Sequence, residues 1–505
     1  MRLYPDFAAF SETYAKGEPQ AVWTRLIADL ETPVSAMLKL AHEKPMSFLL
    51  ESVEGGAVRG RYSIIGFAPD VIWRAHGDEA EVNRSAARDP DKFEPCEGGT
   101  LEALRDLLAE SAIDLPDDLP PMALGIFGYM GYDTVRLIER LPEANPDPIG
   151  IPDALLIRPT VMVIFDAVKD ELTIVTPVRP QKRQSAKTAY TRATERLAMV
   201  VDALDKPLTH ASAPNGADLE FPKSASNTTP AEYETMVKRA KEYIASGDIF
   251  QVVLSQRFSS PFDLPPFSLY RALRRTNPSP FLYYLNFGAF AVAGSSPEIL
   301  VRVRDGQVTI RPIAGTRRRG ANSDEDKRLA EELLADEKER AEHLMLLDLG
   351  RNDVGRVAKI GTVRVTDSFF LENYSHVMHI VSNVVGELSG DYDAVDALMA
   401  GFPAGTVSGA PKVRAMEIID ELEKEKRGLY AGCVGYFSAA GEMDTCIVLR
   451  TSLIKDGMMH VQAGAGIVAD SIPASEQREC EMKAMALFRA AEEAVRFASE
   501  AARGQ

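Results

Sequence analysis

The chain has 505 residues, more than a single hydrophobic core usually holds, which predicts two domains or one large composite fold. Its 74 acidic and 57 basic residues give a formal net charge of −17, which disfavours nucleic acid and anionic membranes as partners. The four cysteines form no C-x-x-C pair, so neither a disulfide framework nor a thiolate zinc site is expected. With an N-terminus that lacks an apolar signal core, these features predict a cytoplasmic protein without a transmembrane segment.

One stretch of the chain indicates a domain junction. Residues 206–229 are rich in Pro, Ser, Asn, Gly and Thr and poor in apolar residues. We therefore predict an N-terminal region at 1–205, a linker at 206–229 and a C-terminal domain at 230–505. Both regions mix β-branched runs with long helices but lack the regular repeat of a doubly wound fold, which favours an α+β fold with antiparallel or mixed sheets.

The C-terminal domain is predicted to begin with a helix followed by a strand. Thr229 and Glu232 form a capping box around Pro230, and apolar residues follow at helical spacing as far as Gly247. The next segment, 249–258, alternates in the manner of a strand with one polar, ligand-facing side. Its apolar face is expected to carry Phe250, Val252, Leu254 and Phe258, and its polar face Gln251, Ser255 and Arg257.

Four arginines surround the Gly315-Thr316 step in the segment 311–319 of this otherwise acidic chain. Guanidinium groups match carboxylate oxygens in paired hydrogen bonds, a glycine admits a ligand close to the backbone, and a threonine hydroxyl adds a donor. The segment therefore indicates an anion-binding site. A solvated basic loop is the alternative, because charge runs usually face water.

Two segments with helical periodicity each carry a Glu-x-x-Glu step, Glu339 with Glu342 and Glu476 with Glu479. Residues three apart lie on the same face of a helix. Two such pairs brought together would form an all-oxygen site, which suits Mg²⁺ because this ion prefers oxygen ligands and keeps several waters. Ordinary surface charge is the alternative, since Glu342 and Glu479 each have a lysine four positions away.

Two histidines and one threonine are further candidates. His376 and His379 would share one face of a helix, but the β-branched residues after them favour a strand, on which they point to opposite faces. At most one is expected to act, as a proton-transfer group or hydrogen-bond donor, and a core histidine is the alternative. Thr406 lies in a glycine-rich turn that leads into a helix at Pro411, whose N-terminus would favour an anion; a simple turn and cap is the alternative.

The segment 461–468 contains Gly464 and Gly466, which fit a loose dinucleotide-binding fingerprint. The segment 470–473 ends in proline, so no helix starts where a pyrophosphate would need one. We predict instead a strand with both glycines on one face, which lets a ligand lie against the backbone. The chain shows no nucleophile elbow, P-loop or cysteine-centred amidotransferase signature, so phosphoryl transfer and covalent Ser or Cys catalysis are not expected.

Taken together, seven collinear segments resemble those of the chorismate-utilising enzymes, and among them the large subunits of anthranilate synthases. The segments are LLES at 49–52, NPSPF at 277–281, PIAGTR at 312–317, EHLM at 342–345, RGLY at 427–430, DTCI at 444–447 and QAGAG at 462–466. The match covers nearly the whole chain and is tightest from about residue 230 onward. The resemblance implies an α+β fold of two large packed β-sheets surrounded by helices.

The resemblance also implies a set of site residues. Glu342 and Glu479 match Mg²⁺ ligands, and Glu339 and Glu476 match partners that orient metal-bound water. Three positions match catalytic contacts: Glu298 as the acid that protonates the departing 4-hydroxyl, His379 in the later loss of pyruvate, and Thr406 beside the ring. The positions that match chorismate-binding residues are Gly315, Thr316, Tyr430, Arg450, Gly464, Ala465 and Gly466.

The implied reaction adds ammonia to chorismate, giving aminodeoxyisochorismate, and then eliminates pyruvate to form anthranilate, the first committed step of tryptophan biosynthesis. Relatives that add water carry a lysine where this chain has Gln251, and aminodeoxychorismate synthases often carry a lysine where it has Ala314. Both positions therefore favour ammonia as the nucleophile and anthranilate as the product. A sibling enzyme making aminodeoxychorismate or isochorismate, and a catalytically silent binding subunit, are the alternatives.

Two partners are implied in addition to chorismate and ammonia. Because the chain has no glutaminase domain, a separate glutamine amidotransferase subunit would supply ammonia, within a heterotetramer. L-Tryptophan would inhibit by binding to the N-terminal region, which makes 1–205 regulatory and 230–505 catalytic. The matching tryptophan-site positions are Glu51, Ser52, Arg61, Pro280, Phe281 and Leu282, although the family often has lysine where Arg61 stands.

Overall fold

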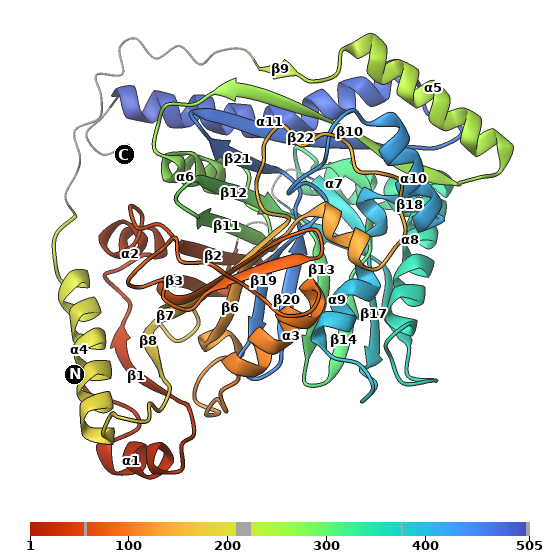
Figure 1. Cartoon of the computed structure of the whole chain (residues 1–505). Coiled ribbons are helices and arrows are strands. Elements are labelled where there is room, and N and C mark those ends of the chain that lie inside the picture. Colours follow the sequence, from red (N-terminus) through yellow and green to blue (C-terminus); the bar gives the residue numbers. More distant parts are fainter. Residues whose placement is uncertain (55–57, 209–223, 375–376, 501–505) are drawn as a thin grey trace.

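The computed structural model describes residues 1–54, 58–208, 224–374 and 377–500, in which 22 strands form one continuous antiparallel network (Figure 1). The network divides into two sheets that share the long strands β3 (Val58–His76) and β7 (Ala154–Asp166). The first half of β3 pairs with β2 (Ser47–Glu54), and its second half pairs with β4 (Glu79–Asn83). The register between β3 and β7 shifts between Pro69 and Val71, so an irregularity separates the two halves.

The first sheet begins at β1 and ends at β10. Beyond β3 and β7 it contains β1 (Gln20–Ile27), β8 (Glu171–Val178), β2, β11 (Phe281–Asn286), β12 (Phe290–Ser296), β21 (Thr451–Lys455), β22 (Met458–Ile467) and β10 (Gln251–Pro261). The short strands β9 (Ala225–Ser226) and β18 (Gly409–Ala410) pair with β10.

The second sheet carries most of the predicted catalytic segments. Its members beyond β3, β4 and β7 are β5 (Glu94–Pro95), β6 (Gly125–Met130), β19 (Cys433–Ser438), β20 (Met443–Ile447), β13 (Ile299–Arg304), β14 (Gln307–Ile310) and β17 (Val377–Glu387). β15 (Ile313–Arg318) and β16 (Arg364–Asn373) both pair with β17.

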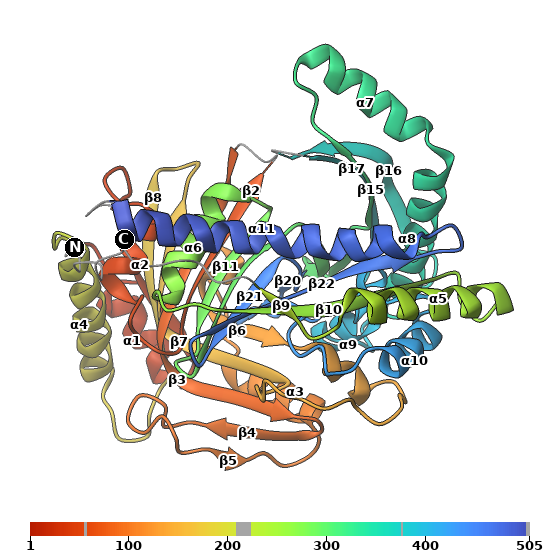
Figure 2. The ribbon, with the colours of Figure 1, turned by 90° about the horizontal axis from the view of Figure 1, so that it is seen from above.

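Helices cover the outer faces of both sheets, so the molecule has a helix, sheet, sheet, helix arrangement (Figures 1 and 2). The first sheet packs against α1 (Phe7–Ala15), α2 (Pro33–Leu40), α4 (Ala186–Leu204), α6 (Pro266–Thr276) and α11 (Pro473–Glu500). Around the second sheet and the adjoining β10 lie α3 (Thr100–Ser111), α5 (Pro230–Ser246), α8 (Glu337–Gly355), α9 (Ala394–Gly401) and α10 (Lys412–Leu422). In Figure 2, α11 runs across the first sheet, and α7 (Ser323–Ala335) projects from the edge formed by β15 to β17.

An apolar core lies between the two sheets, in addition to the apolar cores between each sheet and the helices that cover it. Side chains from both inner faces meet there, among them Phe48, Phe127, Tyr129, Tyr283 and Val292, each at most 1% exposed. Burying one such side chain stabilises the fold by about 1.5–3 kcal/mol. The expected α+β architecture with two large packed sheets is therefore confirmed.

The helix and the strand predicted after residue 229 are largely confirmed. The helix α5 has the capping box at Thr229, and Gly247 ends it with a φ of 84°, a left-handed conformation that favours glycine. The strand β10 begins only at Gln251, so Phe250 precedes it and is 72% exposed. Placing Phe250 on the apolar face was therefore wrong. Gln251, Ser255 and the rest of the polar face are buried as well, because β10 pairs on both edges and helices cover it.

Strands from the two predicted regions pair with each other in both sheets: β2 pairs with β11, and β6 pairs with β19. The division at 1–205, 206–229 and 230–505 stays a prediction, and residues 209–223 of its linker lie outside the described residues. No helix in the described ranges is long and apolar enough to cross a membrane.

Candidate active site

Glu298 is a buried carboxyl group at the junction of β12 and β13, only 5% exposed. Thr406, in the short 3-10 helix Gly405–Val407, donates a hydrogen bond to Glu298 Oε1 at 2.9 Å. Burial raises the pKa of Glu298 to about 8, although Thr406, the backbone N–H of Ile313 and the Arg450 guanidinium all oppose this rise. Glu298 is therefore protonated near neutral pH and can act as an acid.

His379 lies on β17 opposite Thr316 of β15 and is 7% exposed. Its Nδ1 lies 3.1 Å from the Gly315 carbonyl oxygen and 3.0 Å from Thr316 Oγ1. Because a carbonyl only accepts hydrogen bonds, Nδ1 carries the proton and Nε2 is left as the basic nitrogen. Burial, with a contribution from Arg450, lowers the pKa of His379 to about 4, so the ring is neutral at pH 7.

The strand prediction for this histidine pair is confirmed as far as the structure describes it, since His379 lies within β17. His376 lies outside the described residues. The ring of Tyr374 contacts His379 edge-on, with 5.5 Å between the ring centroids.

Gly315 occupies a position where a side chain would not fit. Its φ is 74°, and a Cβ there would lie 3.2 Å from both Glu339 Oε2 and Ile380 Cδ1. The register between β15 and β17 shifts at this residue, which directs the Gly315 carbonyl toward His379. The glycine thus brings strand β15, the histidine and helix α8 into contact.

Three predicted metal-site glutamates gather where α8 faces α11. Burial raises the pKa of Glu342, and the neighbouring charges of Glu339 and Glu479 raise it further. Gln251 Nε2 lies 3.4 Å from Glu342 Oε1, and Gln251 Oε1 is a buried acceptor without a hydrogen-bond partner among the described residues. Carboxylate and amide oxygens are the ligand type that a hard divalent ion prefers.

The fourth glutamate of this set, Glu476, also has a pKa raised by burial, and the Glu479 charge contributes. Lys483 forms the expected i,i+4 ion pair with Glu479 at 2.7 Å and donates to the Gly464 carbonyl oxygen at 2.9 Å. No group of three or more carboxylate, imidazole or thiol side chains in the described part of the chain is arranged so that it could hold a metal ion. A site of two carboxylates completed by water, as predicted, requires no such group.

The glycines of β22 lie beside this cluster, since Gly466 is close to Gln251 and Gly464 is hydrogen-bonded to Lys483. The predicted strand is confirmed, and β22 pairs with β10 so that Gly464 faces Ser255 and Gly466 faces Val253. A Cβ on Gly464 would lie 2.8 Å from the Tyr430 hydroxyl, and one on Gly466 would lie 2.6 Å from Gln251 Nε2. A side chain at either position would therefore overlap the Tyr430 hydroxyl or the Gln251 amide, so these two close contacts require glycine. Ala465, between them, is fully buried.

The arginines of the segment 311–319 all have carboxylate partners. Arg317 contacts Glu332, Asp336 and Glu339, and Arg311 pairs with Glu372. The two remaining pairs join Arg318 to Glu325 and Arg319 to Asp326, both on α7. The expectation that this run is an anion clamp is thus not supported for its arginines, whose charges the next two helices and β16 neutralise.

The predicted tryptophan-site residues meet where β2 pairs with β11. Ser52 lies opposite Phe281, and Glu51 lies opposite Leu282, with Pro280 immediately before the strand. Both oxygens of Glu51 accept hydrogen bonds from α6: Arg274 donates at 2.6 and 2.9 Å, and Tyr270 donates at 2.5 Å. Ser52 Oγ donates to the Tyr62 carbonyl oxygen at 3.1 Å. Arg61 pairs instead with Asp166 of β7 at 2.9 Å.

A positioning pair was missed at the sequence level. Glu423 and Arg427 form a buried ion pair, and Glu423 accepts hydrogen bonds from the backbone and side chain of Ser255. Arg427 also donates to the carbonyl oxygens of Val253 and Val407. The pair therefore holds β10 and the Thr406 turn in place. In the sequence, Arg427 belongs to the RGLY segment, and its i,i+4 spacing from Glu423 could have indicated the pair.

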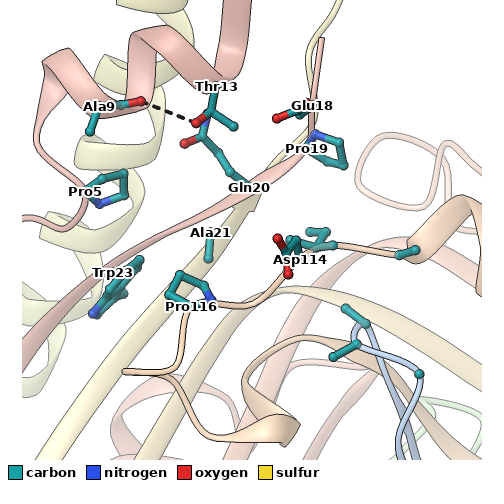
Figure 3. Close-up of a pocket in the computed structure, with 15 residues that line it drawn as sticks. Pro5, Ala9, Thr13, Glu18, Pro19, Gln20, Ala21, Trp23, Asp114 and Pro116 are labelled. Atoms are coloured by element: carbon teal, nitrogen blue, oxygen red, sulfur yellow. Dashed lines mark hydrogen bonds between the residues drawn. The ribbon is translucent and has the colours of Figure 1, made fainter. Parts of the chain in front are cut away.

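A cavity of about 910 Å³ lies elsewhere, between α1, β1 and the turn that joins β19 to β20 (Figure 3). It is lined by Trp23, Gln20 and Asp114 among others, and by none of the predicted site residues. Large volume alone therefore does not mark the candidate active site in this chain.

Comparisons with known proteins agree with this geometry. The family model of the chorismate binding enzymes matches residues 49–489. The chain is 57% identical to anthranilate synthase component 1 of Cereibacter sphaeroides, over 99% of each protein. The crystal structure of anthranilate synthase component I from Streptococcus pneumoniae aligns with a TM-score of 0.74 at 36% identity, covering 92% of this chain and 99% of that one.

A more distant solved structure shares the fold alone. The menaquinone-specific isochorismate synthase from Escherichia coli aligns with a TM-score of 0.69 at 20% identity, covering 96% of this chain and 98% of that one. The family match and the near-complete coverage of close relatives establish the family of this chain. This chain belongs to the chorismate binding enzymes and, within them, to the anthranilate synthase component 1 proteins.

Proposed function

We propose that this chain converts chorismate and ammonia to anthranilate and pyruvate, as the large subunit of an anthranilate synthase in tryptophan biosynthesis. The observation that carries the proposal is the pair formed by Glu298 and His379. One is a buried carboxyl group whose pKa of about 8 keeps its proton, and the other is a neutral imidazole whose pKa is about 4. Two groups with pKa values pushed in opposite directions suit a reaction that needs an acid and a base.

The acid step belongs to Glu298. Ammonia adds to the ring while the 4-hydroxyl departs, and the proton of Glu298 lets that group leave as water. Thr406 donates to Oε1 and so fixes the carboxyl orientation. The nearby Arg450 guanidinium, whose own pKa is lowered by burial, supplies positive charge to a substrate carboxylate.

The second step eliminates pyruvate and aromatises the ring. Removal of the ring proton requires a base, and the Nε2 of His379 has the correct protonation state for it. The Gly315 carbonyl and the Thr316 hydroxyl hold the Nδ1 side of the ring, so they fix the direction in which Nε2 points.

Glu342 and Glu479 would hold Mg²⁺, and Glu339 and Glu476 would orient its water molecules. The support is the burial of Glu342 and Glu476, whose pKa values are raised further by neighbouring glutamate charges, together with the buried Gln251 Oε1 that lacks a hydrogen-bond partner in the described structure. The ion would supply positive charge to a chorismate carboxylate. Magnesium removal should abolish anthranilate formation, and Glu342→Gln should prevent its recovery on Mg²⁺ addition. If turnover by that variant were unchanged, the metal assignment would be wrong.

The residues near the ring support ammonia as the nucleophile. Gln251 is 4% exposed and faces Glu342, and an amide at this position cannot serve as the base that activates water. Ala314 is buried on β15 and has no amine that could attack the ring. Incubation of the purified chain with chorismate, Mg²⁺ and an ammonium salt should therefore yield fluorescent anthranilate. Accumulation of isochorismate or 4-amino-4-deoxychorismate would overturn the proposal.

The nitrogen would come from glutamine through a separate amidotransferase subunit. Glutamine hydrolysis needs a thiolate of lowered pKa, whereas burial raises the pKa of all four cysteines of this chain. The chain alone should thus use ammonium but not glutamine. Turnover with glutamine in the absence of any other protein would contradict this part of the proposal.

L-Tryptophan would act as a feedback inhibitor at the junction of β2, β11 and α6. There the Glu51 carboxylate is fixed by Arg274 and Tyr270, next to Ser52, which pairs with Phe281 of β11. Ser52→Phe should remove inhibition while leaving uninhibited turnover intact. Retained inhibition in that variant, or lack of tryptophan binding to the wild type, would contradict the site.

A further inference from the structure

A second cavity, of about 510 Å³, lies between α4, the end of β8 and the segment 84–88 that follows β4. None of the residues lining it belongs to the predicted catalytic or tryptophan sites. The volume falls within the range of small-molecule sites in proteins. Its walls come from segments far apart in the sequence, so it is a product of the tertiary fold.

The lining of this cavity is strongly basic in a chain of net charge −17. Five arginines line it: Arg84, Arg88, Arg179, Arg192 and Arg196. The only carboxylate in the lining is Asp70, which already forms a two-point ion pair with Arg158 at 2.8 and 3.1 Å. Nearby Glu110 is shared between Arg84 and Arg158.

Four of these arginines lack a carboxylate partner. Among the described residues, none lies within 4.0 Å of Arg88, Arg179, Arg192 or Arg196. This contrasts with the segment 311–319, in which every arginine is paired. Asp70 and Glu110 offset part of this positive charge at longer range, and a bound anion would neutralise the remainder.

Two of the unpaired arginines are also partly buried. Arg179 Nε is buried without a hydrogen-bond partner in the described structure, while its Nη2 donates to the Ser111 carbonyl oxygen at 3.1 Å. Burial, helped by the charge of Arg158, lowers the pKa of Arg179 to about 10. Burial also lowers the pKa of Arg196, whose Nη1 donates to Thr176 Oγ1 at 2.6 Å. Both side chains are thus held in place by the fold and are not extended into solvent.

We infer that this cavity, the arginine pocket, binds a small phosphorylated metabolite, a phosphate monoester or diphosphate carrying at least two negative charges. Guanidinium groups match phosphate oxygens in paired, charge-assisted hydrogen bonds. Four unpaired arginines exceed what a single carboxylate can neutralise. The hydroxyls of Ser85 and Thr160 and the amide of Gln181 line the same space and can bind the hydroxyls of an attached sugar-sized group.

The negative charge of the rest of the chain favours a small molecule over a macromolecule as the occupant of this pocket. A nucleic acid or an acidic protein surface would meet the negative charge of the rest of this chain, whereas a small anion enters the cavity alone. Binding here is independent of the proposed chorismate reaction, because neither proposal uses residues of the other.

The test is calorimetric titration of the full chain with inorganic pyrophosphate, inorganic phosphate and ribose 5-phosphate at constant ionic strength. Pyrophosphate should bind, and Arg192→Gln combined with Arg196→Gln should weaken it by about tenfold or more, as expected when charge-assisted bonds are lost. Ribose 5-phosphate binding more tightly than inorganic phosphate would show that the attached group also contributes.

The matched control is Lys187→Gln, which removes one positive charge from the same helix at an exposed position outside the pocket. It should change pyrophosphate affinity less than twofold, by the weak effect of distant surface charge. The single variant Arg192→Gln, at an exposed side chain, carries little risk to folding and should show the same direction of change.

Absence of pyrophosphate and sugar-phosphate binding to the wild type overturns the inference, as does equal weakening by Lys187→Gln. Binding of an acidic peptide in place of these anions would overturn it too and mark a protein contact. Anthranilate formation without any added phosphate compound should be the same in all variants. A failed phosphate-binding test can therefore be distinguished from a failure of the proposed function.

Discussion

Glu298 and Glu51 are both buried carboxyl groups, 5% exposed each, but their surroundings differ. Glu298 is bonded by one hydroxyl and one backbone N–H, and burial raises its pKa to about 8. Glu51 is held on both oxygens by the Arg274 guanidinium and the Tyr270 hydroxyl. The first group keeps a proton that it can give away, and the second holds a fixed charge that organises its neighbours.

Burial alone therefore does not assign a role to a carboxyl group. What decides is whether a cation compensates its charge. Glu298 lacks a direct ion pair in the described structure, which suits proton transfer. Glu51 has one, which suits a structural or ligand-orienting role next to Ser52.

The largest expected effect comes from Glu298→Gln, which keeps the shape of the side chain but removes its proton. Loss of a general acid should lower kcat by about 10²–10⁴-fold. Steady-state anthranilate fluorescence measures it, and circular dichroism verifies the fold. The matched variant Glu51→Gln should retain turnover. Equal losses of kcat in the two variants would contradict the difference in role between Glu298 and Glu51.

The pH dependence of kcat/KM should report the pKa values of Glu298 and His379. Glu298 is protonated below its pKa of about 8, so activity should fall as the pH rises above that value. His379 is neutral above its pKa of about 4, so activity should fall as the pH drops below that value. The basic limb should be missing from the residual activity of Glu298→Gln. Persistence of an unchanged basic limb would assign it to another group.

A smaller effect, on stability, is expected from Glu51→Gln. The change leaves the buried guanidinium of Arg274 without its charge partner, which should lower the free energy of unfolding by about 1–3 kcal/mol. Urea denaturation monitored by fluorescence measures this change. Glu298→Gln should not destabilise the chain at pH 8 or above, because it replaces a group that is costly to ionise there.

The smallest effect should come from Thr406→Val, which removes one hydrogen bond to Glu298 while keeping the volume. Because Thr406 opposes the rise in the pKa of Glu298, its loss should move the basic limb of the pH profile to higher pH. The kcat near neutral pH should fall by about tenfold at most, the value of one hydrogen bond. A shift of the limb toward lower pH would contradict the proposed contact.

Local sequence patterns determined much of this structure. The capping box at Thr229, the strand around His379 and the glycines of β22 were predicted correctly, because caps, β-branched runs and period-two alternation act through near neighbours. The seven collinear segments also indicated the family correctly. The exposure of Phe250 was missed, since the exact start of a strand depends on its pairing partners.

Only the tertiary structure decided which charges are compensated. The arginines of 311–319 stand together in the sequence, yet α7, α8 and β16 supply a carboxylate to each. The arginines of the arginine pocket lie between positions 84 and 196 of the sequence, where no local pattern connects them, and all of them but Arg84 meet without such a partner in the described structure. Likewise, the pKa values of Glu298 and His379 follow from burial and from neighbours distant in sequence. Electrostatic environment depends on distances in space, so sequence could name the titratable groups but not their charge states.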